Sequence, residues 1–268
     1  ETSVIAVEHN TLSQTVRHAH GYSIYILLVL MRFFYRYATR LIAVSQGVKD
    51  DLKDMLKLKD RCVTVIYNPV ITERLTAQSK ETIRHPFFDD QSSPVIVAAG
   101  RLTQAKGFAL LLDALSLVIR DTPCRLIILG EGPDREALEA QLRQLDLQDA
   151  VSLPGFVTNP YSYFCNSSLF VLSSYWEGLP TVLIEALACG TPVVSTDCPS
   201  GPNEILENGR LGKLVPVGDV NALATAIRET LTSKRGAVLP EALSERFSEE
   251  SCVARYRELI NEVAALKT

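Results

Sequence analysis

Short apolar segments alternate with segments of helical periodicity along most of the chain. The apolar segments predict strands at residues 4–7, 41–44, 63–66, 95–99, 126–129, 151–153, 169–173 and 193–196. Several of them are continuous apolar runs, which a parallel sheet buried on both faces requires. Helical periodicity is clearest at residues 108–119, 135–145 and 180–189. This order predicts an α/β fold of doubly wound parallel sheets, with ligands at the carboxyl ends of the strands.

A change of composition divides this pattern. Residues 77–94 are polar, lack periodicity and contain Pro86 and Pro94, so they predict a linker. The linker separates a partial α/β domain (residues 1–76) from a nearly complete one (residues 95–246). The last segment, residues 247–268, predicts an amphipathic helix, with Ser248 as its N-cap.

Composition narrows the class of protein. The 268 residues are 47% hydrophobic and 22% charged, which is typical of a folded protein. A net charge of −4 argues against a nucleic-acid partner, and six cysteines without a Cys-x-x-Cys pair indicate reduced thiols and a cytoplasmic protein. No apolar run reaches the ~18 residues of a spanning helix, and no secretory signal is visible. Because the chain begins with Glu1 inside a strand-like run, we expect it to be a fragment.

Two carboxylates stand around one predicted strand-to-helix turn. Glu177 follows the strand at residues 169–173, and Glu185 lies inside the next helix, which Pro180 is expected to begin and Gly190 to end. Glu185 is the only charged residue in an apolar stretch, so its charge requires a ligand hydroxyl or a basic group. Taken alone, the two acids are open to a glycosidase, a metal site or a structural explanation.

Three other strand ends also carry glycine, together with polar, charged or apolar residues. Residues 100–107 place Arg101 and Lys106 between a strand and a helix, where backbone amides and the helix dipole favour an anion. Residues 130–133 contain two glycines that allow close approach of a ligand, but they form neither a dinucleotide fingerprint nor a P-loop. Residues 154–157 offer an apolar wall for a nucleobase. Each of these has a structural explanation alone, but all four together indicate a ligand site.

These motifs, with Ala186 to Pro192, resemble the retaining nucleotide-sugar glycosyltransferases of family 4, which have the GT-B fold of two Rossmann-like domains. The similarity is dense over residues 95–263 and looser before them, and the terminal helix is expected to cross back to the N-terminal domain. The resemblance implies metal-independent transfer of a hexose or N-acetylhexosamine from a nucleotide sugar, expected to be UDP-linked. The acceptor would be a glycan or a lipid-linked molecule of cell-surface polysaccharide, lipopolysaccharide or glycoconjugate synthesis. No cofactor is implied beyond the nucleotide sugar as co-substrate.

The resemblance also implies roles for single residues. Arg101 and Lys106 would bind the donor diphosphate and stabilise the leaving group. Glu185 would accept the ribose hydroxyls, Glu177 would hold the donor sugar, and His9 would approach that sugar across the cleft. The expected donor-binding set is Gly100, Gly130, Glu131, Gly132, Phe156, Val157, Gly178, Leu179, Pro180, Thr181, Val182 and Glu185. Two carboxylates that serve opposite ends of one ligand disfavour a glycosidase, in which both flank a single bond.

A metal site is not expected. The chain has no Asp-x-Asp, and His18 and His20 lack further ligands in the sequence. The helical stretch at residues 24–37 is apolar and aromatic, with Arg32, Arg36 and Arg40 on one face. It is open to two interpretations: peripheral docking on an anionic membrane, at the cytoplasmic face of the inner membrane, or a core helix with solvated arginines.

The chain departs from the family pattern at its beginning. Family members open with a Gly-rich loop and further strands of the N-terminal domain, which are absent here, so the acceptor half is incomplete. Two alternatives to an active transferase therefore stay open: a truncated, non-catalytic nucleotide-sugar-binding module, and a GT-B-fold epimerase of UDP-N-acetylhexosamine. The epimerase would need acid and base residues facing C2 of the sugar, and the sequence offers no dedicated set.

Overall fold

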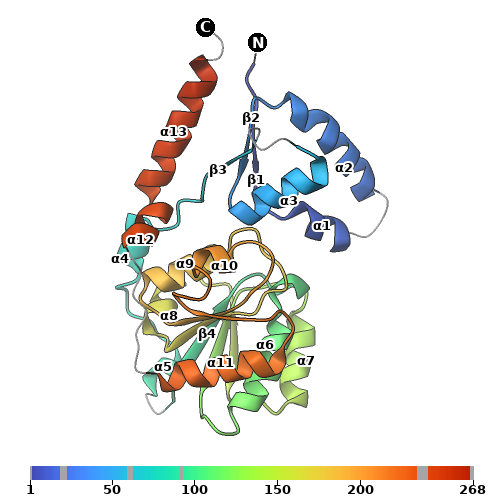
Figure 1. Ribbon diagram of the computed structural model, residues 1–268. Coiled ribbons are helices and arrows are strands. Elements are labelled where there is room, and N and C mark those ends of the chain that lie inside the picture. The colour runs from blue at the N-terminus through green and yellow to red at the C-terminus, as the bar shows by residue number, and fades with distance from the viewer. Residues whose placement is uncertain (1, 19–22, 59–62, 91–92, 234–240, 266–268) are drawn as a thin grey trace.

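The computed structural model describes residues 2–18, 23–58, 63–90, 93–233 and 241–265, which form two parallel β-sheets with helices packed against them (Figure 1). The smaller sheet has the order β1-β2-β3, and the larger has the order β6-β5-β4-β7-β8-β9. Their strands are β1 (Ile5–Glu8), β2 (Arg40–Ala43), β3 (Val63–Val65), β4 (Val95–Ala99), β5 (Arg125–Leu129), β6 (Val151–Gly155), β7 (Leu169–Leu172), β8 (Val193–Thr196) and β9 (Lys213–Val215). The predicted α/β class is confirmed.

Helices connect these strands. In the smaller unit they are α1 (Leu12–His18), α2 (Ser23–Phe34), the 3-10 turn η1 (Tyr35–Tyr37) and α3 (Gln46–Leu56), followed by α4 (Glu73–Gln78) and α5 (Pro86–Asp89). In the larger unit they are η3 (Gln104–Lys106), α6 (Phe108–Val118), α7 (Arg135–Gln144), α8 (Tyr161–Asn166), α9 (Thr181–Ala188), α10 (Pro202–Ile205) and α11 (Val220–Thr232). The chain ends with α12 (Glu241–Phe247) and α13 (Glu249–Ala265).

The larger sheet reverses its winding direction beside its first strand. The chain passes from β4 outward to β5 and β6, then returns to β7 on the other side of β4 and continues to β8 and β9. In doubly wound sheets, ligands bind beyond the carboxyl ends of the strands at this switch point. Here those ends are the loops after β4 and β7, which carry Arg101 and Glu177.

The continuous apolar runs are explained by burial of the larger sheet on both faces. Along β4, Val95, Val97 and Ala99 belong to one apolar cluster, whereas Ile96 and Ala98 belong to the cluster under α6, α7 and α11. Successive strand residues point to opposite faces, so both sets must be apolar when helices cover both faces. The first cluster continues into the smaller unit through residues of β2 and α3.

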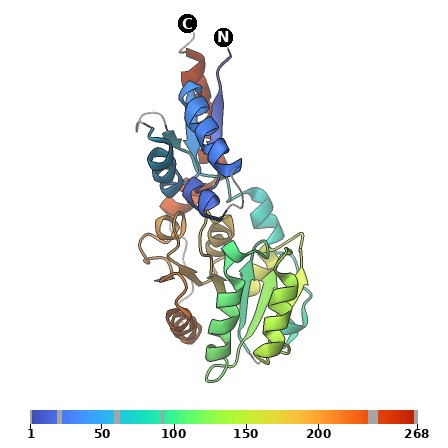
Figure 2. The ribbon, with the colours of Figure 1, turned by 90° about the vertical axis from the view of Figure 1, so that its right-hand side faces the viewer.

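The C-terminal helix packs on the smaller sheet. Leu259 of α13 forms a small apolar cluster with Ile42 of β2 and Ile66, which follows β3. Ahead of the helix, the Phe247 carbonyl accepts hydrogen bonds from the backbone amides of Val70 and Ile71, both at 3.0 Å. Figures 1 and 2 show α13 in red beside the smaller sheet. The Ser248 hydroxyl accepts a 3.1 Å hydrogen bond from the Ser251 amide, which confirms Ser248 as a helix cap.

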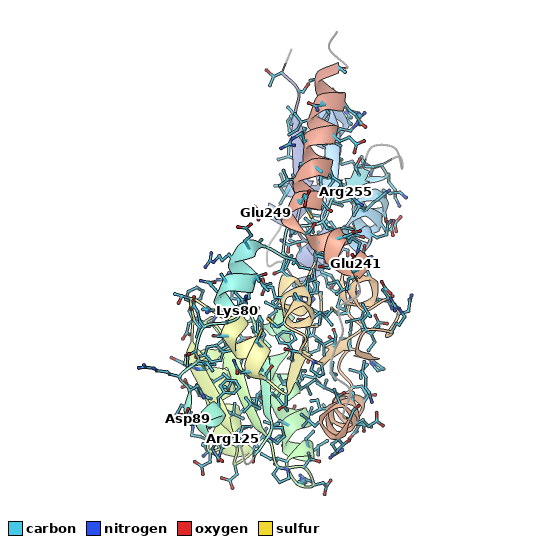
Figure 3. All side chains as sticks on the ribbon, turned by 90° about the vertical axis from the view of Figure 1, so that its left-hand side faces the viewer. Lys80, Asp89, Arg125, Glu241, Glu249 and Arg255 are labelled. Atoms are coloured by element: carbon cyan, nitrogen blue, oxygen red, sulfur yellow. The ribbon has the colours of Figure 1, made fainter. Side chains whose placement is uncertain are left out.

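The segment predicted as a linker, residues 77–94, contains the end of α4 and all of α5. Figure 3 shows it running down one side of the larger unit, from Lys80 to Asp89 beside Arg125. Two side chains fasten it there: Asn159 donates to the Gln78 carbonyl at 2.9 Å, and His85 Nε2 lies 3.0 Å from the Ser152 hydroxyl. Its path is therefore fixed against the larger unit.

Two details differ from the sequence prediction. The sequence gives no sign of β9, because three residues that begin with a lysine are too short and too polar to stand out as a buried run. Helix α9 begins at Thr181, and Pro180 precedes it with φ −72° and ψ 90°, which is an extended conformation outside the helix. Within the described ranges, no helix combines the length and the apolar character that a membrane span needs.

Candidate functional site

A cavity of about 470 Å³ lies at the carboxyl ends of β4, β5 and β6 and the start of α9. Its lining residues are Ala99, Gly100, Arg101, Leu129, Gly130, Glu131, Phe156, Val157, Pro160 and Val182. Seven of the residues predicted from the sequence are among them. The volume falls within the range of small-molecule sites, and the lining combines apolar side chains with a few charges, as such sites do. Phe156 is 78% exposed at this cavity, which leaves its ring free for a flat ligand to stack on.

The glycines of this region allow strand-end loops to approach each other closely. A Cβ atom at Gly130 would lie 2.0 Å from the Gly100 carbonyl oxygen, and one at Gly132 would lie 2.2 Å from the Leu102 carbonyl oxygen. Both separations are shorter than any real contact, so neither position accepts a side chain without movement of backbone. The structure therefore places Gly130 at the cavity, and Gly132 under the neighbouring loop, away from the cavity lining.

Lys106 and Glu177 form a direct ion pair. The Lys106 Nζ lies 2.6 Å from the Glu177 Oε1, and the Ser174 hydroxyl donates to the same oxygen at 2.6 Å. Glu177 is 9% exposed, so its carboxylate is held by partners that offset the cost of burying a charge. The aliphatic part of the Lys106 side chain passes over Gly100, a cavity residue: a Cβ atom added to Gly100 would lie 3.3 Å from the Lys106 Cδ and Cε atoms. The ion pair therefore adjoins the cavity.

Glu185 lies one helical turn beyond Val182, a cavity residue, and on the same face of α9. Burial raises the pKa of the Glu185 carboxyl to about 7. Burial is the cause of this shift, and no hydrogen bond or ion pair to the carboxylate occurs among the described residues. This carboxylate is thus the part of the site that most needs a hydrogen-bond donor from a ligand.

Glu131 is already paired with a residue that the sequence analysis did not single out. Arg135 holds both of its carboxylate oxygens, at 2.5 Å and 2.8 Å, and also donates to Glu139 at 3.0 Å. The hydrogen bond from Arg135 lowers the pKa of Glu131 below its ordinary value. Only the pair with Glu139 has a helical signal in the sequence, because Arg135 begins α7 and Glu139 lies four residues further on the same helix face, whereas Glu131 belongs to the loop before the helix.

The segment after β7 is where the two units meet. Gly178 packs against the loop after β1: a Cβ atom there would lie 1.9 Å from the His9 carbonyl oxygen. His9 directly follows β1, and its side chain is exposed. The His9 backbone therefore contacts this turn, and the role predicted for its side chain stays a prediction. Leu179 and Pro180 are buried, and Thr181 begins α9.

The predicted residues thus fall into neighbouring groups around the cavity, the ion pair and the turn into α9. Arg101 is exposed at the cavity, and no ion pair to it occurs within the described ranges. Those ranges also contain no cluster of three or more metal-ligating side chains, and His20 lies outside them. That the site works without a metal stays a prediction.

Comparison with known proteins matches the two parts of the chain to glycosyltransferase families. The profile of the family described as "Glycosyl transferases group 1" matches residues 93–233, and that of "Glycosyltransferase Family 4" matches residues 2–74. An uncharacterized glycosyltransferase of Methanocaldococcus jannaschii is 37% identical over 185 residues, which are 68% of this chain and 45% of the relative. The Campylobacter jejuni N-acetylgalactosamine-N,N'-diacetylbacillosaminyl-diphospho-undecaprenol 4-alpha-N-acetylgalactosaminyltransferase is 32% identical over 202 residues, 75% of this chain and 53% of the enzyme. The chain spans about half the length of these relatives.

Solved structures share the fold. The Anabaena protein HepE, in a complex with UDP and glucose, matches with a TM-score of 0.81 at 22% identity, over 97% of this chain and 72% of that one. This likeness confirms the predicted GT-B fold. Because the group 1 profile alone matches more than half of the 268 residues, the chain belongs to the group 1 glycosyltransferases.

Proposed function

We propose that this chain is the donor-binding part of a retaining glycosyltransferase that uses a nucleotide sugar. The observation that carries the proposal is the cavity at the switch point of the larger sheet, with Arg101 at its lining and the Lys106–Glu177 pair beside it. A nucleotide sugar has a flat base, ribose hydroxyls, a diphosphate and a sugar. The site offers a matching series: an exposed aromatic ring, a partly buried carboxylate with no ion pair or hydrogen bond to its side chain among the described residues, two cations, and a second carboxylate.

In this proposal the two cations neutralise the diphosphate. Arg101 and Lys106 would stabilise the negative charge that grows on the leaving group as the bond from the sugar to the phosphate breaks. Lys106 is now paired with Glu177, so a bound diphosphate would share this cation with the carboxylate. Glu177 would then accept hydrogen bonds from the sugar and stabilise positive charge at its anomeric carbon. Retention would follow if the donor phosphate takes the acceptor proton on the face from which it leaves.

The acceptor is proposed to be a glycan or a lipid-linked molecule. The support is the Campylobacter jejuni relative, whose name describes a diphospho-undecaprenol acceptor. The donor is proposed to carry UDP, and the HepE complex makes UDP-glucose the first compound to test. Transfer to an acceptor would appear as UDP release with a new glycosidic bond, and its anomeric configuration by NMR tests retention. A binding module would bind without release, and an epimerase would convert the sugar without release.

Calorimetry with variants tests the diphosphate assignment. Arg101→Ala and Lys106→Ala should each weaken binding of a UDP-sugar by about tenfold or more, because each removes a charge-assisted hydrogen bond to phosphate. Lys80→Ala is the matched control, since this lysine lies on the outer side of the larger unit (Figure 3). Unchanged affinity in both site variants contradicts the assignment.

We also propose that α2 docks on an anionic membrane. The helix and the turn after it expose a set of large apolar side chains: Tyr25, Ile26, Leu27, Val29, Leu30, Phe33, Phe34 and Tyr37. Arg36 lies over the rings of Phe33 and Tyr37, at 4.4 Å and 5.0 Å from their centroids. This exposure disfavours the alternative of a core helix. The predicted face of three arginines is wrong, because Arg40 lies in β2, but Arg32 of α2 and Arg36 of η1 are exposed, and cations beside an apolar face suit an anionic lipid surface.

Vesicle binding tests the membrane proposal. The chain should co-sediment with phosphatidylglycerol vesicles and less with phosphatidylcholine vesicles. Val29→Asp, at a position 68% exposed, should abolish this binding, whereas Ile260→Asp on α13, at a position 54% exposed, should not. Equal binding by the two variants, or none by the unmodified chain, contradicts the proposal.

A further inference from the structure

Three consecutive residues of the larger unit, Trp176, Glu177 and Gly178, are each held by a different residue of the smaller unit. The His18 ring stacks on the Trp176 ring, with centroids 3.9 Å apart and planes 10° from parallel. The Thr11 hydroxyl donates to the Glu177 carbonyl at 3.4 Å. The Ser45 hydroxyl donates to the Gly178 carbonyl at 2.9 Å. We call residues 176–178 the held segment.

The two hydroxyl contacts are buried and come from well-fixed positions. Thr11 is 4% exposed and directly precedes α1, and Ser45 is fully buried as the N-cap of α3. The Ser45 oxygen accepts the Val48 amide at 3.1 Å and lies 2.9 Å from the Gly178 carbonyl and 2.7 Å from the Ser200 hydroxyl, which itself donates to that carbonyl at 2.6 Å. The Ser45 oxygen is thus fixed by the cap of α3 at a place where it contacts both the Gly178 carbonyl and the Ser200 hydroxyl. The smaller unit thus presents two rigid donors to the backbone of the held segment.

Glu177 is consequently held by both units at once. Its carbonyl binds Thr11 of the smaller unit, and its carboxylate binds Lys106 and Ser174 of the larger unit. Within the larger unit, the described main-chain contacts of Glu177 are limited to a long amide hydrogen bond to Pro199, at 3.4 Å. The backbone position of Glu177 therefore depends in part on a contact that the smaller unit supplies, while Lys106 and Ser174 of the larger unit orient its carboxylate.

We infer that Thr11 and Ser45 are positioning residues, which hold Glu177 at the donor cavity through its backbone and that of Gly178. The identity of the ligand in this inference rests on the proposed function. The placement of the held segment by Thr11 and Ser45 is independent of that function. Loss of either hydroxyl should leave the base and ribose end of the cavity intact, because β4, β5, β6 and α9 form it. It should instead weaken the contribution of Glu177 to binding of the sugar.

The chain provides its own probe of this segment, because Trp176 is its only tryptophan. The variants are Thr11→Val and Ser45→Ala, with Thr11→Ser as the conservative variant that keeps the hydroxyl. Thr72→Ala is the matched control for Ser45→Ala, because Thr72 caps α4 through the same kind of hydrogen bond, away from the site. Tryptophan emission and acrylamide quenching are measured without ligand, and dissociation constants are then measured for UDP and for UDP-glucose.

Without ligand, Thr11→Val and Ser45→Ala should show red-shifted emission and faster quenching than the unmodified chain, Thr11→Ser and Thr72→Ala. With ligand, both variants should bind UDP with unchanged affinity. The ratio of the UDP affinity to the UDP-glucose affinity should shift against UDP-glucose by about three- to tenfold, because this corresponds to the free energy of one hydrogen bond. Unchanged emission and quenching in both variants overturn the inference. If Ser45→Ala does not fold, Thr11→Val decides. Failure of the unmodified chain to bind either compound would contradict the proposed function instead, and the ligand-free spectra would still decide the positioning role.

Discussion

The carboxyl of Glu185 makes donor binding depend on pH in a defined direction. Burial raises the pKa of this group to about 7, so about half of it is protonated at neutral pH in the empty site. Ribose hydroxyls that donate to the carboxylate stabilise its ionised form and lower the pKa on binding. Binding should therefore release a proton near neutral pH, and affinity should rise with pH until the carboxyl is ionised before the ligand arrives.

The size of the effect follows from the ionised fraction. With a pKa of about 7, roughly half of the Glu185 carboxyl is ionised at pH 7 but only about 3% at pH 5.5, so affinity should fall about fifteenfold. The same shift affects the empty protein. Because the folded-state pKa of Glu185 lies above the unfolded value near 4.5, its contribution to the free energy of unfolding is fully present below pH 4.5. This contribution is lost as the pH rises through about 7, and the total loss is about 3 kcal/mol.

Calorimetry with a nucleotide sugar between about pH 5.5 and pH 8 measures this dependence. A nucleotide sugar is the right ligand because its bridged diphosphate does not titrate there, whereas a terminal phosphate does, with a pKa of about 6. Glu185→Gln is the control: it removes this titration and leaves that of every other group, so the difference between the two profiles belongs to Glu185. Identical pH profiles for the two proteins would refute the assignment of Glu185 to the ribose.

Three further predictions concern packing and metal use. Gly178→Ala should destabilise the protein by about 1–3 kcal/mol in chemical denaturation, because its Cβ would lie 1.9 Å from the His9 carbonyl oxygen; an unaltered midpoint would contradict this contact. Leu259→Ala should cost about 2–5 kcal/mol, whereas Ile260→Ala, at the exposed neighbouring position, should cost little; equal losses would show that α13 does not cover the smaller sheet. Donor affinity should be the same with and without a chelator of divalent cations, and a large loss would show that a metal shares the work of Arg101.

Much of the fold could be predicted because its signals are local. The five apolar residues of β4 had to be buried on both faces, and the structure places alternate residues in two separate clusters. The capping of α13 by Ser248 was equally local. Strand β9 was missed because three residues at the edge of the sheet carry too little apolar pattern to be recognised. The start of α9 was placed one residue early, since proline suits both the cap and the first turn.

The site was predictable only in part. Strand ends that carry glycine and charge indicated the loops, but the contacts between loops depend on the strand order, which periodicity does not reveal. Lys106 meets Glu177 because β7 lies directly beside β4, although the two residues are 71 positions apart in the sequence. The contacts of Thr11 and Ser45 with the held segment depend on how the two units meet, which no local pattern encodes. The pair of Arg135 with Glu139, by contrast, could have been found from the four-residue spacing inside α7.

A crystal structure of this chain with a bound nucleotide sugar tests the central claim most directly. The account predicts the base against Phe156, the ribose hydroxyls at Glu185, the diphosphate between Arg101 and Lys106, and the sugar at Glu177. A ligand bound elsewhere, or bound in the reverse direction with its base at Lys106, would contradict it.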